Sequence, residues 1–198
     1  MTPKAPRLSG APRGGAFLLA LMLVLSLAPA VRAQTELERR QQAGVRLFRS
    51  LLAADLDLPK KTSDGKLLIV FFYTDNRRQA DAAAAMMANE KKELEKIREF
   101  PVVVETTNDP SLKGLAGRNV GAIFIAQSPN SSVLKTLIRQ GIEKQIVVYS
   151  PFEGHVENGV LGGISVEAQV RPYVNRATLE ASHISLKPFF LKVTKVYQ

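Results

Sequence analysis

Apolar residues recur along this chain with two different periods, and the middle of the chain shows both. Residues 66–74 form a continuous apolar run rich in aromatic and β-branched side chains, which is typical of a strand buried on both faces. Shorter apolar runs at 102–106, 120–126 and 145–149 predict three further strands.

Helical spacing separates these strands. Apolar residues three and four positions apart predict helices over 34–57 and 78–100, and a helical turn over 112–115. A further helix before the fourth strand ends at Gly141, and its cap is one of three polar residues, Ser128, Asn130 or Ser131. Strands that alternate with helices favour a mostly parallel sheet with helices on its faces.

In the last fifty residues, the spacing of the apolar positions changes. Apolar and polar residues alternate from Ile164 to Val174, which predicts one strand with a single buried face. Pro172 cannot donate to a sheet ladder, so this strand is expected at an edge or ends there. A short helix over 176–181 follows, and then a terminal helix capped by Ser185, whose apolar face holds Leu186, Phe189, Phe190, Val193 and Val196. The expected fold class is therefore α/β: a mostly parallel sheet flanked by helices, with a C-terminal edge strand and a terminal helix.

The first 33 residues have the three parts of a secretory signal peptide. Basic residues come first, an apolar run covers 16–27, and small residues end at Ala33, after which we expect cleavage; Ala30 is the second choice. The alternative is a retained membrane anchor, but the apolar run is shorter than the ~20 residues that span a bilayer.

A periplasmic location and a single domain over 34–198 follow from this interpretation. No other apolar stretch is long enough for a transmembrane helix. Loss of residues 1–33 removes four basic residues and lowers the net charge from +9 to +5. Acidic and basic residues are interleaved in the remainder, so nucleic acid is not an expected partner.

Candidate catalytic chemistry is sparse. The chain has no cysteine and only two histidines, which excludes thiol chemistry and thiolate metal sites. His155 lies between Glu153 and Glu157, but these residues are explained as a turn rather than as ligands. Neither Ser128 nor Ser150 has the surrounding pattern of a nucleophile elbow. We expect no enzyme activity, no metal and no cofactor.

Two places are candidates for binding. Arg77 and Arg78 follow the first strand of the predicted sheet, where an anion is often held near a helix N-terminus; the alternative is two exposed arginines. The 151–158 loop is the expected protein contact, with Phe152 as an apolar residue among turn formers and Glu153 and His155 beside it.

The C-terminal sequence GVLGGISVEAQVRPYVNRATLEASHISLKPFFLKVTKVYQ, residues 159–198, resembles the YfiR-like family of small periplasmic proteins. Its pattern is glycines before a strand, an alternating strand that ends at Asn175, a short helix, and a last helix with bulky apolar residues at the chain end. The resemblance implies a non-enzymatic regulator that restrains a membrane-bound diguanylate cyclase from the periplasmic side. Such regulators can use cysteine pairs for redox control, which this chain lacks.

Three functions remain as hypotheses at this point. The first is an exported regulatory module that contacts a membrane or envelope protein and can also form a homodimer. The second is a single-lobe periplasmic receptor for a small solute or anion, related to substrate-binding proteins. The third, ranked last, is an enzyme in which His155, Glu153 and Asp75 converge in one pocket.

Overall fold

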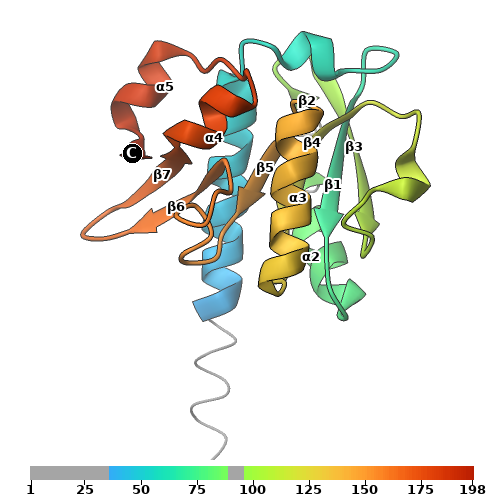
Figure 1. Cartoon of the computed structure of the whole chain (residues 1–198), viewed down its shortest axis with the longest axis horizontal. Coiled ribbons are helices and arrows are strands. Elements are labelled where there is room, and N and C mark those ends of the chain that lie inside the picture. Colours follow the sequence, from blue (N-terminus) through green and yellow to red (C-terminus); the bar gives the residue numbers. More distant parts are fainter. Residues whose placement is uncertain (1–35, 89–95) are drawn as a thin grey trace, which may run out of the picture. The chain divides into compact units, whose positions relative to one another are not determined.

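An eight-stranded sheet forms the centre of this computed structural model, which describes residues 36–88 and 96–198. The strand order is β2-β3-β1-β4-β5-β6-β7-β8 (Figure 1). Residues 39–198 form one compact unit. The expected signal peptide at 1–33 lies outside the described residues.

The five central strands run parallel to one another. They are β3 (Phe100–Thr107), β1 (Leu67–Phe72), β4 (Val120–Ile125), β5 (Val147–Ser150) and β6 (Gly162–Val166). The two ends of the sheet are antiparallel additions. β2 (Lys96–Ile97) pairs with the start of β3, and β7 (Val170–Asn175) pairs with β6 in a hairpin. β8 (Lys195–Tyr197) is parallel to β7 and ends the sheet.

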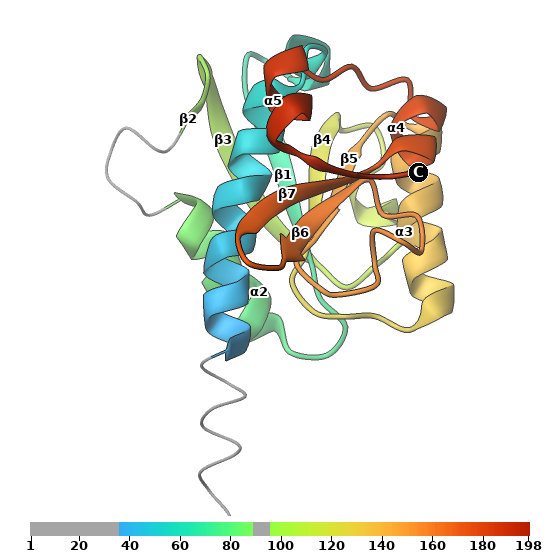
Figure 2. The same ribbon diagram turned by 90° about the vertical axis from the view of Figure 1, so that its left-hand side faces the viewer.

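Helices cover both faces of the sheet. The first helix, residues 36–54, and α2 (Arg77–Ala88) lie on one face, and α3 (Ser131–Glu143) lies on the other (Figure 2). Shorter helices complete the connections between strands. They are η1 (Leu58–Lys61), η2 (Lys113–Leu115), α4 (Arg176–Ala181) and α5 (Pro188–Val193).

Strand β1 supplies side chains to both layers of the core. Leu67, Ile69 and Phe71 pack against the first helix and α2, whereas the alternate side chains pack on the side of α3. All six residues of β1 are buried, because a central parallel strand is covered on both faces. The continuous apolar run was therefore a correct indication of a central strand.

The expected fold class is confirmed: the chain is α/β, with a mostly parallel sheet flanked by helices and a strand at its C-terminal edge. The predicted helix over 78–100 is wrong in its second half, because α2 ends at Ala88 and residues 96–97 form β2. Arg98 has a φ of 56°, which turns the chain back so that Ile97 pairs with Phe100. Pairing with a sheet edge overrides the helical spacing there.

The single alternating strand predicted over 164–174 is also wrong. It is the hairpin of β6 and β7, in which Val166 pairs with Val170. The alternation continues through the turn because three residues separate Val166 from Val170, so residues of the same parity share one face of the sheet in both strands. Beyond Pro172, β8 covers only Tyr173 to Asn175, so β7 is open on that side at the proline.

The terminal helix is shorter than the sequence predicted. α5 ends at Val193, and Thr194 adopts extended backbone before β8. Val196, which the helical spacing placed on the apolar face of that helix, lies instead opposite Val174 in the sheet. None of the helices in the described ranges is both long and apolar enough to cross a membrane.

Candidate functional site

The loop between β5 and β6 is built on a buried histidine. His155 Nδ1 lies 2.8 Å from Ser150 Oγ, and His155 Nε2 lies 3.0 Å from Ser128 Oγ. Ser128 follows β4 and Ser150 ends β5, so the two serines come from the carboxyl ends of neighbouring parallel strands. Ligands of parallel sheets bind at this edge.

The hydrogen-bond pattern assigns the tautomer of His155. The buried Ser150 hydroxyl oxygen accepts a bond from the Phe152 N–H at 3.2 Å, and its own proton needs an acceptor. Among the described residues, His155 Nδ1 is that acceptor. Nε2 therefore carries the ring proton and donates it to Ser128 Oγ.

This tautomer is the reverse of what a serine nucleophile requires. A catalytic histidine accepts the proton of the serine hydroxyl, whereas here the ring donates to Ser128. Burial lowers the pKa of His155, and the nearby Glu157 opposes that effect only in part. The ring joins two strand ends and thereby supports the loop.

The ring of His155 also positions Phe152. Their ring centroids are 5.6 Å apart, and the Phe152 backbone is held by Ser150. Arg40 of the first helix donates to the carbonyl of Pro151 at 2.5 Å. The other end of the loop is tied by Asn175, whose amide donates to the Val156 carbonyl at 2.8 Å.

Asn175 is the strand-ending asparagine of the C-terminal pattern, and its side chain has two roles. Its Nδ2 holds the loop, while its Oδ1 accepts the N–H of Thr178 and caps α4. Thr178 in turn donates to the Gly159 carbonyl at 2.8 Å. The 151–159 loop is thus fixed on both sides by side chains distant in sequence.

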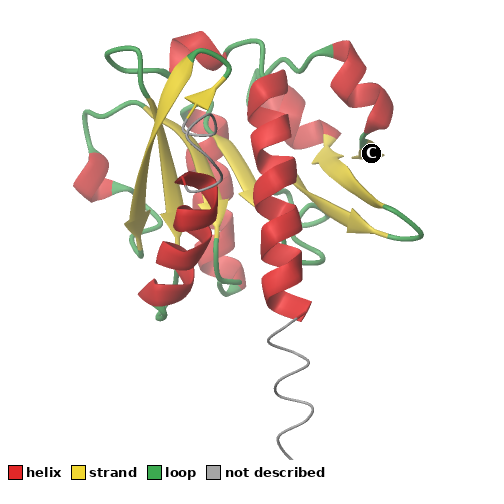
Figure 3. Ribbon diagram, turned by 180° about the vertical axis from the view of Figure 1, so that it is seen from behind, coloured by secondary structure: helices red, strands yellow, loops and turns green. Residues whose placement is uncertain are grey.

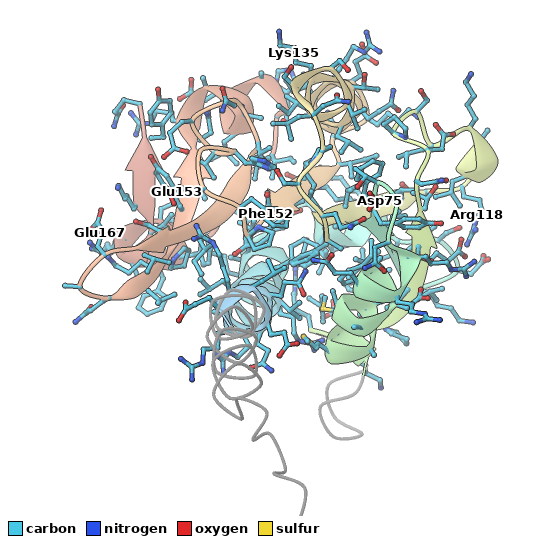
Figure 4. The ribbon with its side chains drawn as sticks, turned by 90° about the horizontal axis from the view of Figure 1, so that it is seen from below. Asp75, Arg118, Lys135, Phe152, Glu153 and Glu167 are labelled. Atoms are coloured by element: carbon cyan, nitrogen blue, oxygen red, sulfur yellow. The ribbon has the colours of Figure 1, made fainter. Side chains whose placement is uncertain are left out.

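A concave pocket of about 190 Å³ lies between this loop and the strands of the C-terminal end. Its lining combines ring faces and charges from four separate parts of the chain. The charged and aromatic members are Arg40, Phe152, Glu153, Glu157, Glu167, Tyr173 and Lys195. Figure 4 shows Phe152, Glu153 and Glu167 on the same side of the molecule.

Two of the charges in this pocket neutralise each other. Lys195 Nζ lies 2.7 Å from Glu167, which also binds Arg171, so the pKa of Glu167 is lowered and that of Lys195 raised. Lys195 stands over the ring of Tyr173, 4.9 Å from its centroid. Burial and the neighbouring Glu157 raise the pKa of the Tyr173 hydroxyl.

Glu153 is different from these residues. Its carboxylate is exposed, and within residues 36–88 and 96–198 it has no hydrogen bond or ion pair. It stands at the pocket beside the Phe152 ring. The pocket therefore offers one unpaired carboxylate together with aromatic surface.

Exposed apolar side chains border the pocket. Val166 and Val170 face each other at the tip of the β6–β7 hairpin and are 56% and 51% exposed. The hairpin projects from the end of the sheet (Figure 3). We call Phe152, Glu153, Val166, Val170 and the pocket between them the hairpin surface.

The other candidate, at Arg77 and Arg78, has a different environment. Gln127 Oε1 accepts the backbone N–H groups of Thr74, Asp75 and Asn76 at 2.9 to 3.2 Å. The amide oxygen therefore fills the position that an anion would take after β1. Arg77 is exposed and lies 3.5 Å from Asp81, and Arg78 is exposed.

The structure thus brings Phe152, Glu153 and His155 together and places the two arginines elsewhere. Asp75, the third residue of the enzyme hypothesis, binds Gln127 rather than His155. Among the described residues, no cluster of three or more histidines and carboxylates is placed to hold a metal ion. The sequence reasoning missed Arg40, Tyr173 and Lys195; the alternation of 165–173 marked Tyr173 only as solvent-facing.

Comparisons with known proteins give no family. No family model matches the chain, and no curated protein matches it. Solved structures with partial similarity include an ABC domain from Streptococcus pneumonia in complex with L-Trp, at 13% identity and a TM-score of 0.46. Another is a conserved domain protein from Vibrio cholerae, at 12% identity and a TM-score of 0.46.

These two matches cover 74% and 72% of this chain. The chain spans 60% and 58% of the two solved proteins. The L-Trp is a ligand of the first protein, and identities of this size say nothing about what this chain binds.

Proposed function

We propose that this chain is an exported, non-enzymatic regulatory protein that acts by contact with another protein through the hairpin surface. The observation that carries the proposal is the pair of exposed valines at the hairpin tip beside a concave, aromatic-lined pocket. Apolar side chains around a concavity with a polar rim are the usual composition of a protein contact.

The hydrogen bonds of His155 support the non-enzymatic part of the proposal. Its ring nitrogens are both engaged by serines, and its proton points toward the one serine that could act as a nucleophile. Ser150 is buried and bonded to the loop it supports. By this assignment Ser128 lacks the general base that acyl transfer needs, and Ser150, whose proton His155 accepts, is fully buried.

The kind of partner follows from the resemblance to the YfiR-like family. That resemblance implies a periplasmic regulator of a membrane protein such as a diguanylate cyclase. Asn175 supports it, because this residue of the shared pattern fixes both the loop and α4. A periplasmic location and a membrane or envelope partner are parts of the same proposal.

The test is a binding titration with a defined partner. Residues 34–198 are titrated with the purified periplasmic part of a membrane-bound diguanylate cyclase from the same organism. Replacing both Val166 and Val170 by serine should weaken binding at least about tenfold, because full burial of one valine side chain is worth about 1.5–3 kcal/mol relative to leaving it exposed. The matched control is Val193→Ser on α5, a valine that is 47% exposed outside the surface.

Two results would contradict the proposal. One is equal affinity for the double variant and the control, which would place the contact elsewhere on the molecule. The other is no binding to any such periplasmic part at concentrations up to ~100 μM, the weak end of specific association. Circular dichroism of each variant separates loss of contact from loss of fold.

A second candidate, a small-ligand receptor, is favoured by one observation. The same pocket carries Arg40 and Lys195 as well as Glu153, so it has both signs of charge that a zwitterion needs. Its volume of about 190 Å³ is below the ~300–1,000 Å³ of most ligand pockets, which favours the protein contact.

A thermal-shift screen separates the two functions. A ligand that binds only the folded chain adds about 2.7 kcal/mol to the free energy of unfolding at a hundred times its Kd. Under the receptor hypothesis, amino acids or small anions raise the melting temperature of the wild type. The increase should vanish in a Glu153→Gln or Arg40→Gln variant.

A further inference from the structure

The opposite end of the sheet has an open backbone edge. β3 pairs with β1 along Val102–Thr107, but on its other side β2 pairs only with Phe100 and Pro101. From Val102 onward, no strand in the described part of the chain covers the outer side of β3. Figure 3 shows β3 beside the short β2 at the end of the sheet away from the hairpin.

The direction of the backbone groups follows from one hydrogen bond. Tyr73 N–H donates to the Thr107 carbonyl at 3.0 Å, so the backbone of Thr107 faces β1. Successive residues of a strand point their N–H and C=O groups to opposite sides. The residues that direct both groups outward are therefore Val102, Val104 and Thr106.

Among the described residues, no feature of Val102–Thr107 blocks pairing with a second strand. Natural edges are blocked by lysine, proline or a bulge, and Val102–Thr107 has none of these. Its single charged residue, Glu105, is held by Arg118 through two bonds of 2.8 and 2.5 Å. Beside the edge, a groove of about 550 Å³ is lined by Val104, Glu105 and Thr106, and from α2 by Ala84, Ala85 and the ion pair of Arg77 with Asp81.

We propose that this edge pairs with the same edge of a second copy, so that β3 and its symmetry mate run antiparallel across a two-fold axis at Val104. The two sheets then continue through the interface, and each of Val102, Val104 and Thr106 uses both its backbone groups. This interface is separate from the hairpin surface: Figure 4 shows Arg118 and Glu167 at opposite ends of the molecule.

Charge and backbone pairing favour this register over the two-fold registers centred on the neighbouring residues Val103 and Glu105. An axis at Glu105 would set two carboxylates directly opposite each other, which is unfavourable. An axis at Val103 would require the outward groups of Phe100, which β2 already uses. With the axis at Val104, Glu105 lies opposite Val103 of the second copy, and no like charges meet.

The choice of a second copy as the occupant follows from the same pattern. In a two-fold interface, the strand pairs with an antiparallel copy of itself, so each residue must be compatible with the residue opposite it. Here Val102 lies opposite Thr106 and Val104 lies opposite Val104, and these residue types favour β-structure. A strand with a net charge would repel its own copy. This edge carries none beyond the internally paired Glu105.

The absence of cysteine from the sequence makes the register directly testable. Val104→Cys should form a disulfide-linked dimer under mild oxidation, because the Cα atoms of an antiparallel hydrogen-bonded pair lie about 5.5 Å apart. Neither Val102→Cys nor Thr106→Cys should form a disulfide-linked homodimer, because the same residue in the second copy would lie about 14 Å away along the strand. A mixture of these last two variants should link efficiently.

Sedimentation velocity provides the second readout. The wild type at micromolar concentration should sediment as a dimer, and Thr106→Pro should raise its dissociation constant at least about tenfold. Proline removes an N–H that points outward, so the pairing with β1 is preserved. Circular dichroism and melting confirm that the variant is folded.

Several outcomes would overturn the inference. The inference would be wrong if the wild type remained a monomer at ~1 mM. It would also be wrong if Val102→Cys formed disulfide-linked dimers as efficiently as Val104→Cys. Dimerisation unchanged by Thr106→Pro would place the interface elsewhere. None of these outcomes bears on binding at the hairpin surface, so the two proposals fail separately.

Discussion

The two ends of the sheet differ in what they leave available for contact. At the β3 end, the side chains mostly have partners, whereas the outward backbone N–H and C=O groups of Val102–Thr107 have no partner among the described strands. At the β6–β8 end, β8 covers Tyr173 to Asn175 of β7, so only short stretches of backbone are left open, and the exposed groups are side chains: two valines and Glu153, which is unpaired among the described residues. An open backbone selects another strand, whereas side chains select a partner by shape and charge.

The ends also differ in how they are held. The segment that leads to β8 is anchored by side chains and bridges distant in sequence, such as the pairing of Asp55 with Leu186. The β3 end is held by a regular parallel ladder on β1. Single side chains should therefore matter more at the C-terminal end, and this expectation can be tested.

The largest effect is expected at the buried ion pair behind the C-terminal segment. Lys61 Nζ lies 2.5 Å from Asp55 Oδ2, and both side chains are almost fully buried. Lys61→Met leaves the Asp55 carboxylate buried without its partner, which should cost about 3–5 kcal/mol in the free energy of unfolding. Urea denaturation followed by circular dichroism measures the loss.

The matched control at the other end is Arg118→Met. It removes the ion pair with Glu105, which is exposed, so the free energy of unfolding should hardly change. Equal losses of unfolding free energy in the two variants would contradict the expectation that single side chains matter more at the C-terminal end of the sheet.

The next effect concerns the glycines that begin β6. A methyl group on Gly163 would lie 2.8 Å from the Ser150 carbonyl oxygen and 2.5 Å from the Val156 side chain. Gly163→Ala should therefore cost about 1–3 kcal/mol and weaken partner binding by displacing the loop. Gly114→Ala, in η2, meets no atom within 4 Å and should be neutral or slightly stabilising in the same thermal melt. Equal stability of the two variants would show that the loop can shift to accommodate the methyl group without a loss of stability.

A smaller effect, of opposite sign, is expected between the two ends. Tyr149 of β5 is buried against Phe48 and Phe124, and its hydroxyl has no hydrogen-bond partner in the described ranges. Burial raises its pKa, so the hydroxyl stays neutral. Tyr149→Phe removes an unsatisfied polar atom and should stabilise the fold by about 1 kcal/mol. A lower melting temperature would mean that the hydroxyl has a partner in solution.

The smallest effect is a pH dependence at the C-terminal end. Burial lowers the pKa of His155 in the folded chain below its usual value of 6.5, so the unfolded chain binds a proton first as pH falls. The contribution of His155 to stability is therefore complete above about pH 6.5 and decreases as pH falls toward the folded-state pKa.

Unfolding midpoints between pH 7.5 and 5 measure this slope, and carboxylates contribute below that range. His155→Gln should flatten the pH dependence. His183→Gln, at the only other histidine of the chain, should leave it in place. A slope that is the same in both variants would assign the titration to another group.

Local sequence predicted the centre of the fold and failed at its ends. The run at 66–74 identified β1 because a strand covered on both faces must be apolar throughout. The spacing at 78–100 and 164–174 did not reveal the turns, because residues 96–97 and the β6–β7 hairpin form by pairing with strands. In the candidate site, sequence identified Phe152 and Glu153 but not Arg40 or Lys195, which reach the pocket from more than 40 residues away on either side.

The sequence by itself determined the alternation of strands and helices and the scarcity of reactive side chains, because burial and composition are local properties. Only the tertiary structure decided where the charges of the C-terminal half meet and that the outer side of β3 is left uncovered by the described strands. It also decided that the side chain of Gln127 accepts the backbone N–H groups that follow β1. Those outcomes depend on strand order and register, which bring together residues that no local pattern connects.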